Sequence, residues 1–118
     1  MRVAVPDLFF LSRIQAVSRQ AGVAIEECPL ARLIERCVAV PPALLILDLH
    51  ATGDPLAVVR TLKSDARTAS IPIVGFYSHV DHELRRLALA AGVDHVLPRS
   101  AFTAKLPGLL AGAIEADS

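Results

Sequence analysis

Polar and charged side chains stand at the ends of several short apolar runs in this chain. They are Asp7, Asp48, His50, Tyr77, Ser78, His79 and Arg99. Carboxylate oxygens can bind a divalent cation, and a carboxylate can accept a phosphoryl group once positive charge neutralises the phosphoryl oxygens around it. These residue types can therefore hold a cation or do chemistry on a bound group, provided that the fold brings them to one place.

The runs that end in these residues have the length and composition of buried β-strands. They are rich in Val, Ile and Leu, and they alternate with stretches whose apolar residues recur every three or four positions, as in helices. The predicted strands are Arg2–Val5, Gly22–Glu26, Ala43–Asp48, Ile71–Tyr77 and His95–Leu97. A helix is predicted after each strand.

Each of the first four predicted helices presents one apolar face. These faces are Leu11, Ile14, Val17 and Ala21; Leu30, Leu33, Ile34 and Cys37; Leu56, Val59 and Leu62; and Leu84, Leu87, Ala88 and Ala91. The fourth helix is predicted to open near Ser78-His79-Val80-Asp81, which has capping-box spacing, and to end at Gly92. The fifth is predicted to begin near Pro107, because proline is tolerated only in a first turn, and to run to about Ile114.

The third and fourth strands read as almost continuous apolar runs, LLIL and IPIVGF. Strands of this kind are buried on both faces, which predicts a parallel sheet with helices on each side. The predicted fold class is α/β, a doubly wound five-stranded parallel sheet. Chemistry in such sheets collects beyond the carboxyl ends of the strands, where the strand order reverses, so we expect Asp7 and Asp48 to face each other there.

Composition narrows the class of protein. The chain has 118 residues, 53% apolar and 20% charged, so residues 1–118 are predicted to form a single domain. Lys plus Arg and Asp plus Glu number 12 each, so no net charge favours binding to nucleic acid or to a membrane. The absence of a membrane-spanning run and of a signal peptide predicts a cytoplasmic protein. Cys28 and Cys37 are predicted to be buried structural thiols.

The chain resembles the receiver domains of bacterial response regulators, a flavodoxin-like family, from Val3 to about Ile114. The resemblance implies the strand order 2-1-3-4-5 for the predicted sheet. The segment Leu45-Ile46-Leu47-Asp48-Leu49 is similar to the family's third strand, and Ala90-Ala91-Gly92-Val93-Asp94 resembles its Ala-Gly-Ala-Asp segment. The resemblance implies a signalling module of a two-component phosphorelay rather than an enzyme. It also implies that Asp48 accepts a phosphoryl group from a histidine kinase or acts in an atypical receiver.

The same resemblance assigns roles to the neighbouring polar residues. It implies that Asp7, the second member of the family's acidic pair, binds Mg²⁺ together with Asp48 and the backbone carbonyl of His50. Arg99, seven residues after Gly92, corresponds to the family's lysine after the fifth strand.

On the fourth strand, the hydroxyl position of the family falls on Tyr77 and the following small residue on Ser78. The tyrosine ring would crowd the phosphoryl group unless it points away, and Ser78 could then substitute for it after a one-residue shift.

Besides Tyr77 and Arg99, other positions depart from the family's pattern. Pro6 replaces the first acid of the acidic pair, which predicts weaker Mg²⁺ binding, and Val96 replaces the switch aromatic of the fifth strand. The loop after Asp48 is one residue shorter than usual, with its proline displaced to Pro55. These departures keep open a degenerate receiver that serves as a phosphorylation-independent scaffold.

The sequence was also compared with the patterns of other ligand sites, which bind cobalamin, zinc or a dinucleotide. Asp48-Leu49-His50-Ala51-Thr52-Gly53 matches the D-x-H-x-x-G signature of cobalamin-binding domains, but it follows a late strand. A zinc or small-ligand site is a further alternative, and its metal ligands would be His50, His79, His82, Asp48 and Asp81. The first turn has no glycine to admit a dinucleotide pyrophosphate.

The expected partners are proteins. The resemblance implies a histidine kinase or another signalling protein. It also suggests a homodimer through the fourth helix, fifth strand and fifth helix, where Arg85, Arg86 and Val96 lie. With Val96 in place of the aromatic, we expect association at this face to depend little on phosphorylation.

Overall fold

The structure, a computed structural model, describes residues 1–78 and 81–110. Within them the elements are β1 (Arg2–Ala4), α1 (Leu8–Ala21), β2 (Glu26–Glu27), the 3-10 turn η1 (Leu30–Arg32), α2 (Leu33–Ala39), β3 (Leu45–Asp48), α3 (Pro55–Ser64), β4 (Ile73–Tyr77), α4 (His82–Ala91), β5 (His95–Pro98) and α5 (Arg99–Leu110). The strands form one sheet in the order β2-β1-β3-β4-β5, with every neighbouring pair parallel. The predicted fold class and strand order are confirmed.

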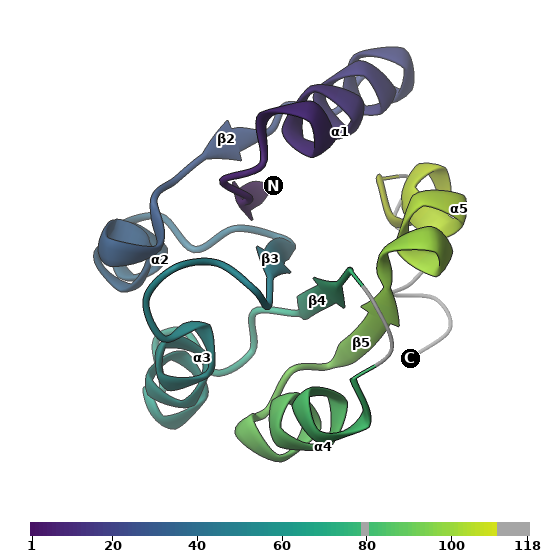
Figure 1. The fold of residues 1–118 in the computed structure, drawn as a ribbon. Coiled ribbons are helices and arrows are strands. Elements are labelled where there is room, and N and C mark those ends of the chain that lie inside the picture. Colours follow the sequence, from purple (N-terminus) through teal and green to yellow (C-terminus); the bar gives the residue numbers. More distant parts are fainter. Residues whose placement is uncertain (79–80, 111–118) are drawn as a thin grey trace.

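Helices cover both faces of this sheet. Figure 1 shows α1 and α5 on one face and α2, α3 and α4 on the other. Successive strand residues point into alternate cores, so that Leu45 and Leu47 pack toward α2–α4 and Ile46 packs toward α1 and α5. All three side chains are fully buried. Burial on both faces is the reason why the central strands are apolar at every position.

Local signals set the ends of α1 and α4. Gly22 and Gly92 end these helices with φ of 71° and 113°, in the left-handed region that glycine adopts without strain. The start of α4 differs from the prediction, because Asp81 rather than Ser78 is the N-cap and its Oδ1 accepts a hydrogen bond of 3.0 Å from the amide of Leu84. His79 and Val80, also part of the predicted capping box, lie outside the described residues.

Two helix faces are narrower than predicted. Leu87, which we expected on the apolar face of α4, is 41% exposed, because Leu84, Ala88 and Ala91 form the stripe that meets the sheet. Ala21, at the last position of α1, is also exposed. In both cases the predicted face was wider than the surface that the sheet can cover.

The second strand is shorter than predicted and lies further along the chain. We expected Gly22–Glu26, whereas β2 is only Glu26–Glu27. Gly22 is used to end α1, and β2 is held in place by side chains: Glu26 accepts hydrogen bonds of 3.3 Å from Arg2 and 3.0 Å from Arg36. These bonds lower the pKa of Glu26. The pairing of an edge strand thus depends on contacts with β1 and α2 that sequence periodicity does not reveal.

The fifth helix begins earlier than predicted, at Arg99 rather than near Pro107, and Pro107 lies inside it. The residues that face the sheet are fully or nearly fully buried; they are Phe102, Leu106, Leu109 and Leu110. Burial of a large apolar side chain contributes about 1.5–3 kcal/mol. Four such side chains offset the roughly 3 kcal/mol that an interior proline costs a helix.

Both cysteines lie in the same core. Cys28 and Cys37 are free and buried in the core on the α2–α4 side, and burial raises the pKa of both thiols. The predicted structural role is therefore supported by their position. None of the described helices is long and apolar enough to cross a membrane.

Replacing Pro107 by Ala should stabilise the protein. The substitution restores the amide that can donate to the carbonyl one turn earlier and removes the ring clash, at an exposed position where no packing is lost. We expect the free energy of unfolding to rise by about 1–2 kcal/mol, less than the full cost of a helical proline because the unfolded chain also becomes freer. Urea denaturation measures it. Lys105→Ala, exposed on the same helix, is the control and should change the midpoint little; an unchanged or lower midpoint for Pro107→Ala would contradict the account of α5.

Candidate functional site

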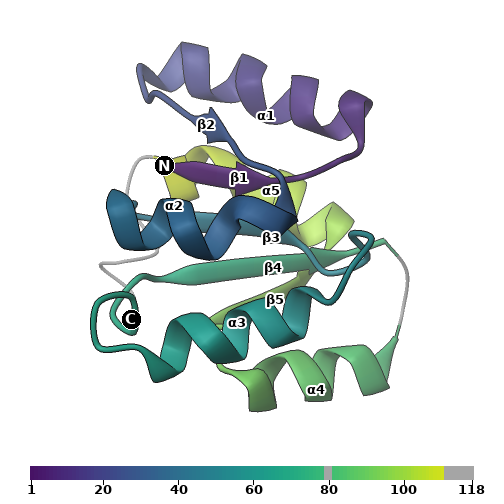
Figure 2. The same cartoon turned by 90° about the vertical axis from the view of Figure 1, so that its left-hand side faces the viewer.

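The polar edge of the sheet lies at the carboxyl ends of β1, β3, β4 and β5. Ala4 of β1 pairs with Leu47 of β3, so Asp7 and Asp48 follow neighbouring strands at the position where the strand order reverses. On the other side of β3, Asp48 pairs with Phe76 of β4. Figure 2 shows these strands running in the same direction, with their loops at one edge. The fold therefore brings Asp7, Asp48, His50, Ser78 and Arg99 to one edge of the molecule.

Asp48 is the most buried carboxylate of this edge, with 6% of its surface exposed. Its Oδ1 accepts a hydrogen bond of 2.8 Å from the amide of His50, in a turn closed by the amide of Ala51 on the carbonyl of Asp48. Its Oδ2 makes no hydrogen bond within residues 1–78 and 81–110. One oxygen thus fixes the carboxylate, and the other remains available to an incoming group.

Both carboxylate oxygens of Asp7 contact a partner. Its Oδ1 caps α1 by accepting a hydrogen bond of 3.1 Å from the amide of Phe10, and its Oδ2 lies 3.5 Å from Nη2 of Arg99. The ion pair is partly solvated, because the two side chains are 37% and 34% exposed. A cation that approaches Asp7 therefore competes with a guanidinium already in place.

Arg99, the first residue of α5, lies over aromatic rings. Its Cζ is 4.4 Å from the ring centroid of Phe10 and 5.7 Å from that of Phe76, and these two rings lie 4.7 Å apart. Its Nε is buried without a hydrogen-bond partner. Within the described part of the chain, no ion pair or hydrogen bond joins Arg99 to Asp48. The structure thus pairs Arg99 with Asp7 and with the aromatic core on the α1–α5 side.

Tyr77 and Ser78 separate into different environments. Tyr77 is 7% exposed and packs with Val96 in the core on the α2–α4 side, so its ring points away from the cluster beneath Arg99. Ser78 is exposed and lines a shallow depression together with Arg99, Arg13 and Ser100. Of the two hydroxyls, Ser78 is the one that shares a surface with Arg99.

The described residues contain no group of three His, Cys, Asp or Glu side chains that could hold a metal ion. This finding disfavours the zinc alternative for His50, His82, Asp48 and Asp81, while His79 lies outside the described range. His50 is exposed, and the contact of its backbone amide is with Asp48. A site made of two carboxylates and the backbone carbonyl of His50 has a different composition and stays a prediction.

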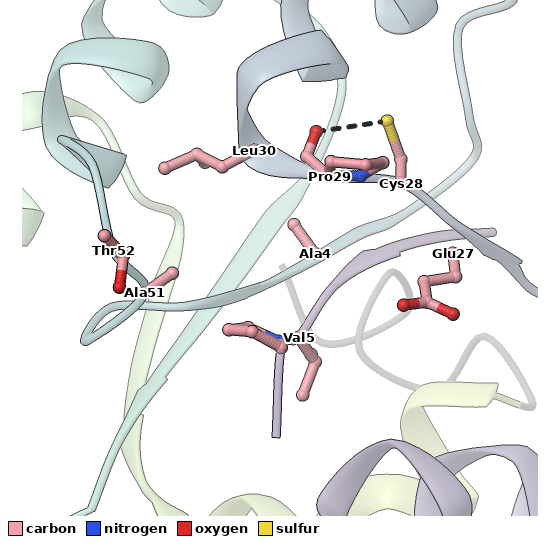
Figure 3. Close-up of a pocket in the computed structure, with 9 residues that line it drawn as sticks. Ala4, Val5, Glu27, Cys28, Pro29, Leu30, Ala51 and Thr52 are labelled. Atoms are coloured by element: carbon pink, nitrogen blue, oxygen red, sulfur yellow. Dashed lines mark hydrogen bonds between the residues drawn. The ribbon is translucent and has the colours of Figure 1, made fainter. Parts of the chain in front are cut away.

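Sequence analysis missed two features of this edge. One is the pair Phe10 and Phe76 beneath Arg99; the helical spacing of Phe10 after the cap Asp7 was the available signal. The other is a pocket of about 350 Å³ beside Pro6, at the carboxyl ends of β1 and β2. Figure 3 shows Glu27 and Thr52 on opposite sides of its apolar lining. No sequence motif marks this pocket, because its walls come from three segments that are far apart in the sequence.

Comparison with known proteins identifies the fold. No family model and no curated protein sequence matches this chain, but solved structures match over nearly its whole length. A putative response regulator from Chloroflexus aurantiacus is 17% identical, with a TM-score of 0.80 over 93% of this chain and 95% of that one. The phosphorylated cyanobacterial phytochrome response regulator RcpA is 19% identical (TM-score 0.74; 97% and 89% covered). The Mn(2+)-bound form of response regulator Rcp1 is 16% identical (TM-score 0.73; 92% and 88% covered). The chain therefore has the fold of response-regulator receiver domains.

The capping role of Asp7 can be separated from its ion pair by two substitutions. Asp7→Ala removes both contacts and should lower the free energy of unfolding by about 1 kcal/mol, the usual value of an N-cap. Asp7→Asn retains an oxygen that can accept from the amide of Phe10, and a half-exposed ion pair contributes little, so its loss should be well under half as large. Urea denaturation of both variants measures the two losses in the free energy of unfolding. Equal losses would show that the ion pair, not the cap, is the stabilising contact.

Proposed function

We propose that residues 1–118 form a single receiver-like domain of a two-component phosphorelay, which accepts a phosphoryl group on Asp48. The observation that carries the proposal is the state of Asp48: it is nearly buried at the carboxyl end of β3, with Oδ1 fixed by the amide of His50 and Oδ2 without a hydrogen-bond partner among the described residues. The shared fold with phosphorylated RcpA supports it. The role is that of a signalling module that receives phosphoryl from a partner rather than an enzyme with a metabolite substrate.

The chemistry proposed for Asp48 is attack on phosphorus. An oxygen of the carboxylate forms a bond to the phosphorus of a phosphohistidine on a histidine kinase, the P–N bond breaks, and the electron pair returns to the imidazole with a proton from solvent. The negative charge that gathers on the phosphoryl oxygens requires positive charge close by. Arg99 supplies a positive charge that is paired with Asp7, and Ser78 supplies an exposed hydroxyl on the same surface as Arg99.

A divalent cation fits this edge in part. Asp7, Asp48 and the backbone carbonyl of His50 supply the oxygen ligands that Mg²⁺ accepts, and waters would complete its coordination. Such an ion would neutralise the phosphoryl oxygens. Pro6 contributes no ligand, and the Arg99 guanidinium already neutralises Asp7, so we propose that binding is weaker than with a full acidic pair. The Mn(2+)-bound structure of Rcp1 supports a divalent ion on this fold.

A protein partner beyond the kinase would meet α4, β5 and α5, and we propose this face for a homodimer or another signalling protein. Leu87 and Leu89 are 41% and 44% exposed on α4, next to Arg85 and to the Arg86–Glu83 ion pair. Apolar side chains within a charged surface are common in protein interfaces. A cytoplasmic location follows from the proposed kinase partner.

Removing the carboxylate of Asp48 should abolish phosphorylation. We expect a small-molecule phosphodonor such as acetyl phosphate to add one phosphoryl group to wild type in the presence of Mg²⁺, and none to Asp48→Asn, because an amide cannot form the acyl phosphate. Intact-protein mass spectrometry detects the adduct. Asp54→Asn is the control, since asparagine can keep the cap on Ala57 while removing a nearby carboxylate.

Two outcomes would contradict the proposed phosphorylation. Equal labelling of Asp48→Asn would move the acceptor elsewhere. If wild type is neither labelled nor changed in its amide NMR shifts around Asp7, Asp48 and Arg99 by beryllofluoride, the alternative of a phosphorylation-independent scaffold is the better description.

Removing the guanidinium of Arg99 should strengthen divalent-cation binding. Arg99→Gln frees Oδ2 of Asp7 from its ion pair and removes repulsion toward the incoming ion, which we expect to raise the affinity for Mn²⁺ by roughly three- to tenfold, equivalent to about 0.7–1.4 kcal/mol. Paramagnetic broadening of the amide signals of Asp7 and Asp48 during a Mn²⁺ titration measures this affinity. Arg19→Gln, on the exposed surface of the last turn of α1, is the matched control. Equal Mn²⁺ affinity of Arg99→Gln and wild type would show that the two cations do not compete at Asp7.

A further inference from the structure

The pocket beside Pro6 is formed by several elements of the fold rather than by a single loop. It has a volume of about 350 Å³, within the roughly 300–1,000 Å³ of small-molecule sites. Its walls come from the end of β1, from β2 with the following turn η1, and from the loop between β3 and α3. These elements meet beside the strand-order reversal, which is where open α/β sheets bind ligands.

The floor of the pocket is apolar and fixed. Ala4, Val5 and Cys28 are buried, and Ala51 is 9% exposed. The loop after β3 packs tightly on η1: a Cβ added at Gly53, whose φ is 108°, would lie 3.1 Å from Cδ2 of Leu30. The thiol of Cys28 donates a hydrogen bond of 3.4 Å to the carbonyl of Pro29, so this polar group of the floor already has a partner. An occupant would therefore meet a rigid apolar surface.

Two polar side chains of the lining remain available. Neither Glu27 nor Thr52 makes a side-chain hydrogen bond or ion pair in the described part of the chain, and both are exposed. Figure 3 shows them at opposite ends of the apolar lining formed by Ala4, Val5 and Leu30. A ligand that fills the pocket can thus place one polar group against the Glu27 carboxylate and its apolar body between the two ends.

Glu27 is the charged residue in the lining of the pocket, and its carboxylate is negative at neutral pH. Because no three described His, Cys, Asp or Glu side chains converge, the pocket does not offer the ligand set of a bound metal ion. The complementary ligand is an organic cation.

We propose that this pocket binds a small organic ammonium ion with an apolar body, its ammonium group paired with the Glu27 carboxylate and its body against Ala4, Val5 and Leu30. The proposal does not rest on phosphorylation of Asp48. The occupant would contact both the β1–α1 loop, through Pro6, and the β3–α3 loop, through Ala51 and Thr52, which are the loops that carry Asp7 and Asp48.

The test uses 2-phenylethylammonium as the probe, compared with the neutral 2-phenylethanol and the anionic 3-phenylpropanoate. In a ¹H–¹⁵N NMR titration of the full chain, we expect saturable shifts for the amides of Glu27, Cys28, Ala51 and Thr52. The ammonium should bind roughly three- to tenfold more tightly than the alcohol, the range expected of an exposed charge pair, and the carboxylate should bind least.

Two variants separate the contribution of charge from that of shape. Glu27→Gln should reduce affinity for the ammonium by the same factor and leave the alcohol unchanged, whereas Glu35→Gln, an exposed change on α2 away from the pocket, should alter neither. Ala51→Leu, which fills the cavity, should weaken both ligands, with the amide spectrum away from the loop confirming that it is folded. The assignment is overturned if the three probes bind alike, if Glu27→Gln binds the ammonium like wild type, or if the shifts do not saturate.

Discussion

The structure depends above all on the burial of β3 and β4 on both faces. A strand with no solvated face can be apolar along its whole length, and helices must then cover it on each side, which requires long crossover connections and a parallel sheet. Polar groups are costly inside such a sheet unless they are hydrogen-bonded, so they collect at the strand ends, where loops and solvent satisfy them. Asp48 marks this boundary, because it is the last residue of β3 and its oxygen is bonded at once by the following turn.

The same constraint explains the position of Arg99. The core between the sheet and helices α1 and α5 contains three aromatic rings, Phe10, Phe76 and Phe102, with centroids 4.7–5.6 Å apart. The guanidinium at the start of α5 covers the edge of this cluster and reaches Asp7 at the start of α1. A lysine could form the ion pair but could not stack a planar group on Phe10 in the same way. The arginine is therefore a structural contact between two helices as well as the cation of the candidate site.

The comparisons establish the fold of this chain, whereas its chemistry has to be judged from the geometry of the candidate site. At 16–19% identity, the receiver fold is retained over nearly the whole chain, which agrees with the fact that many apolar sequences fill the same core. At the edge itself, Pro6 offers no carboxylate, Tyr77 lies in the core with Val96, and Ser78 shares the surface with Arg99. Fold alone therefore leaves the chemistry open, and the function rests on the geometry of Asp48 and its neighbours.

Local patterns in the sequence determined much of this protein. The apolar runs and helical spacings predicted five strands, a parallel sheet and the edge that carries Asp7 and Asp48, because these depend on periodicity and on burial of both faces of the sheet, whereas the order of the strands came from the resemblance to receiver domains. Local patterns failed where distant residues decide the outcome. Residues Arg2 and Arg36 fix β2 through Glu26, and burial of Phe102 and its neighbours extends α5 past Pro107.

At the site, the sequence supplied the residue types, and only the tertiary structure decided their pairing. Asp7 and Arg99 are separated by 92 positions, and nothing in either segment predicts that they meet, or that Tyr77 turns into one core while Phe76 turns into the other. The pocket between Glu27 and Thr52 likewise exists only because three segments that are far apart in the sequence meet at one edge of the sheet. Periodicity along a chain records which residues are buried, whereas the partner of each side chain is set by packing in three dimensions.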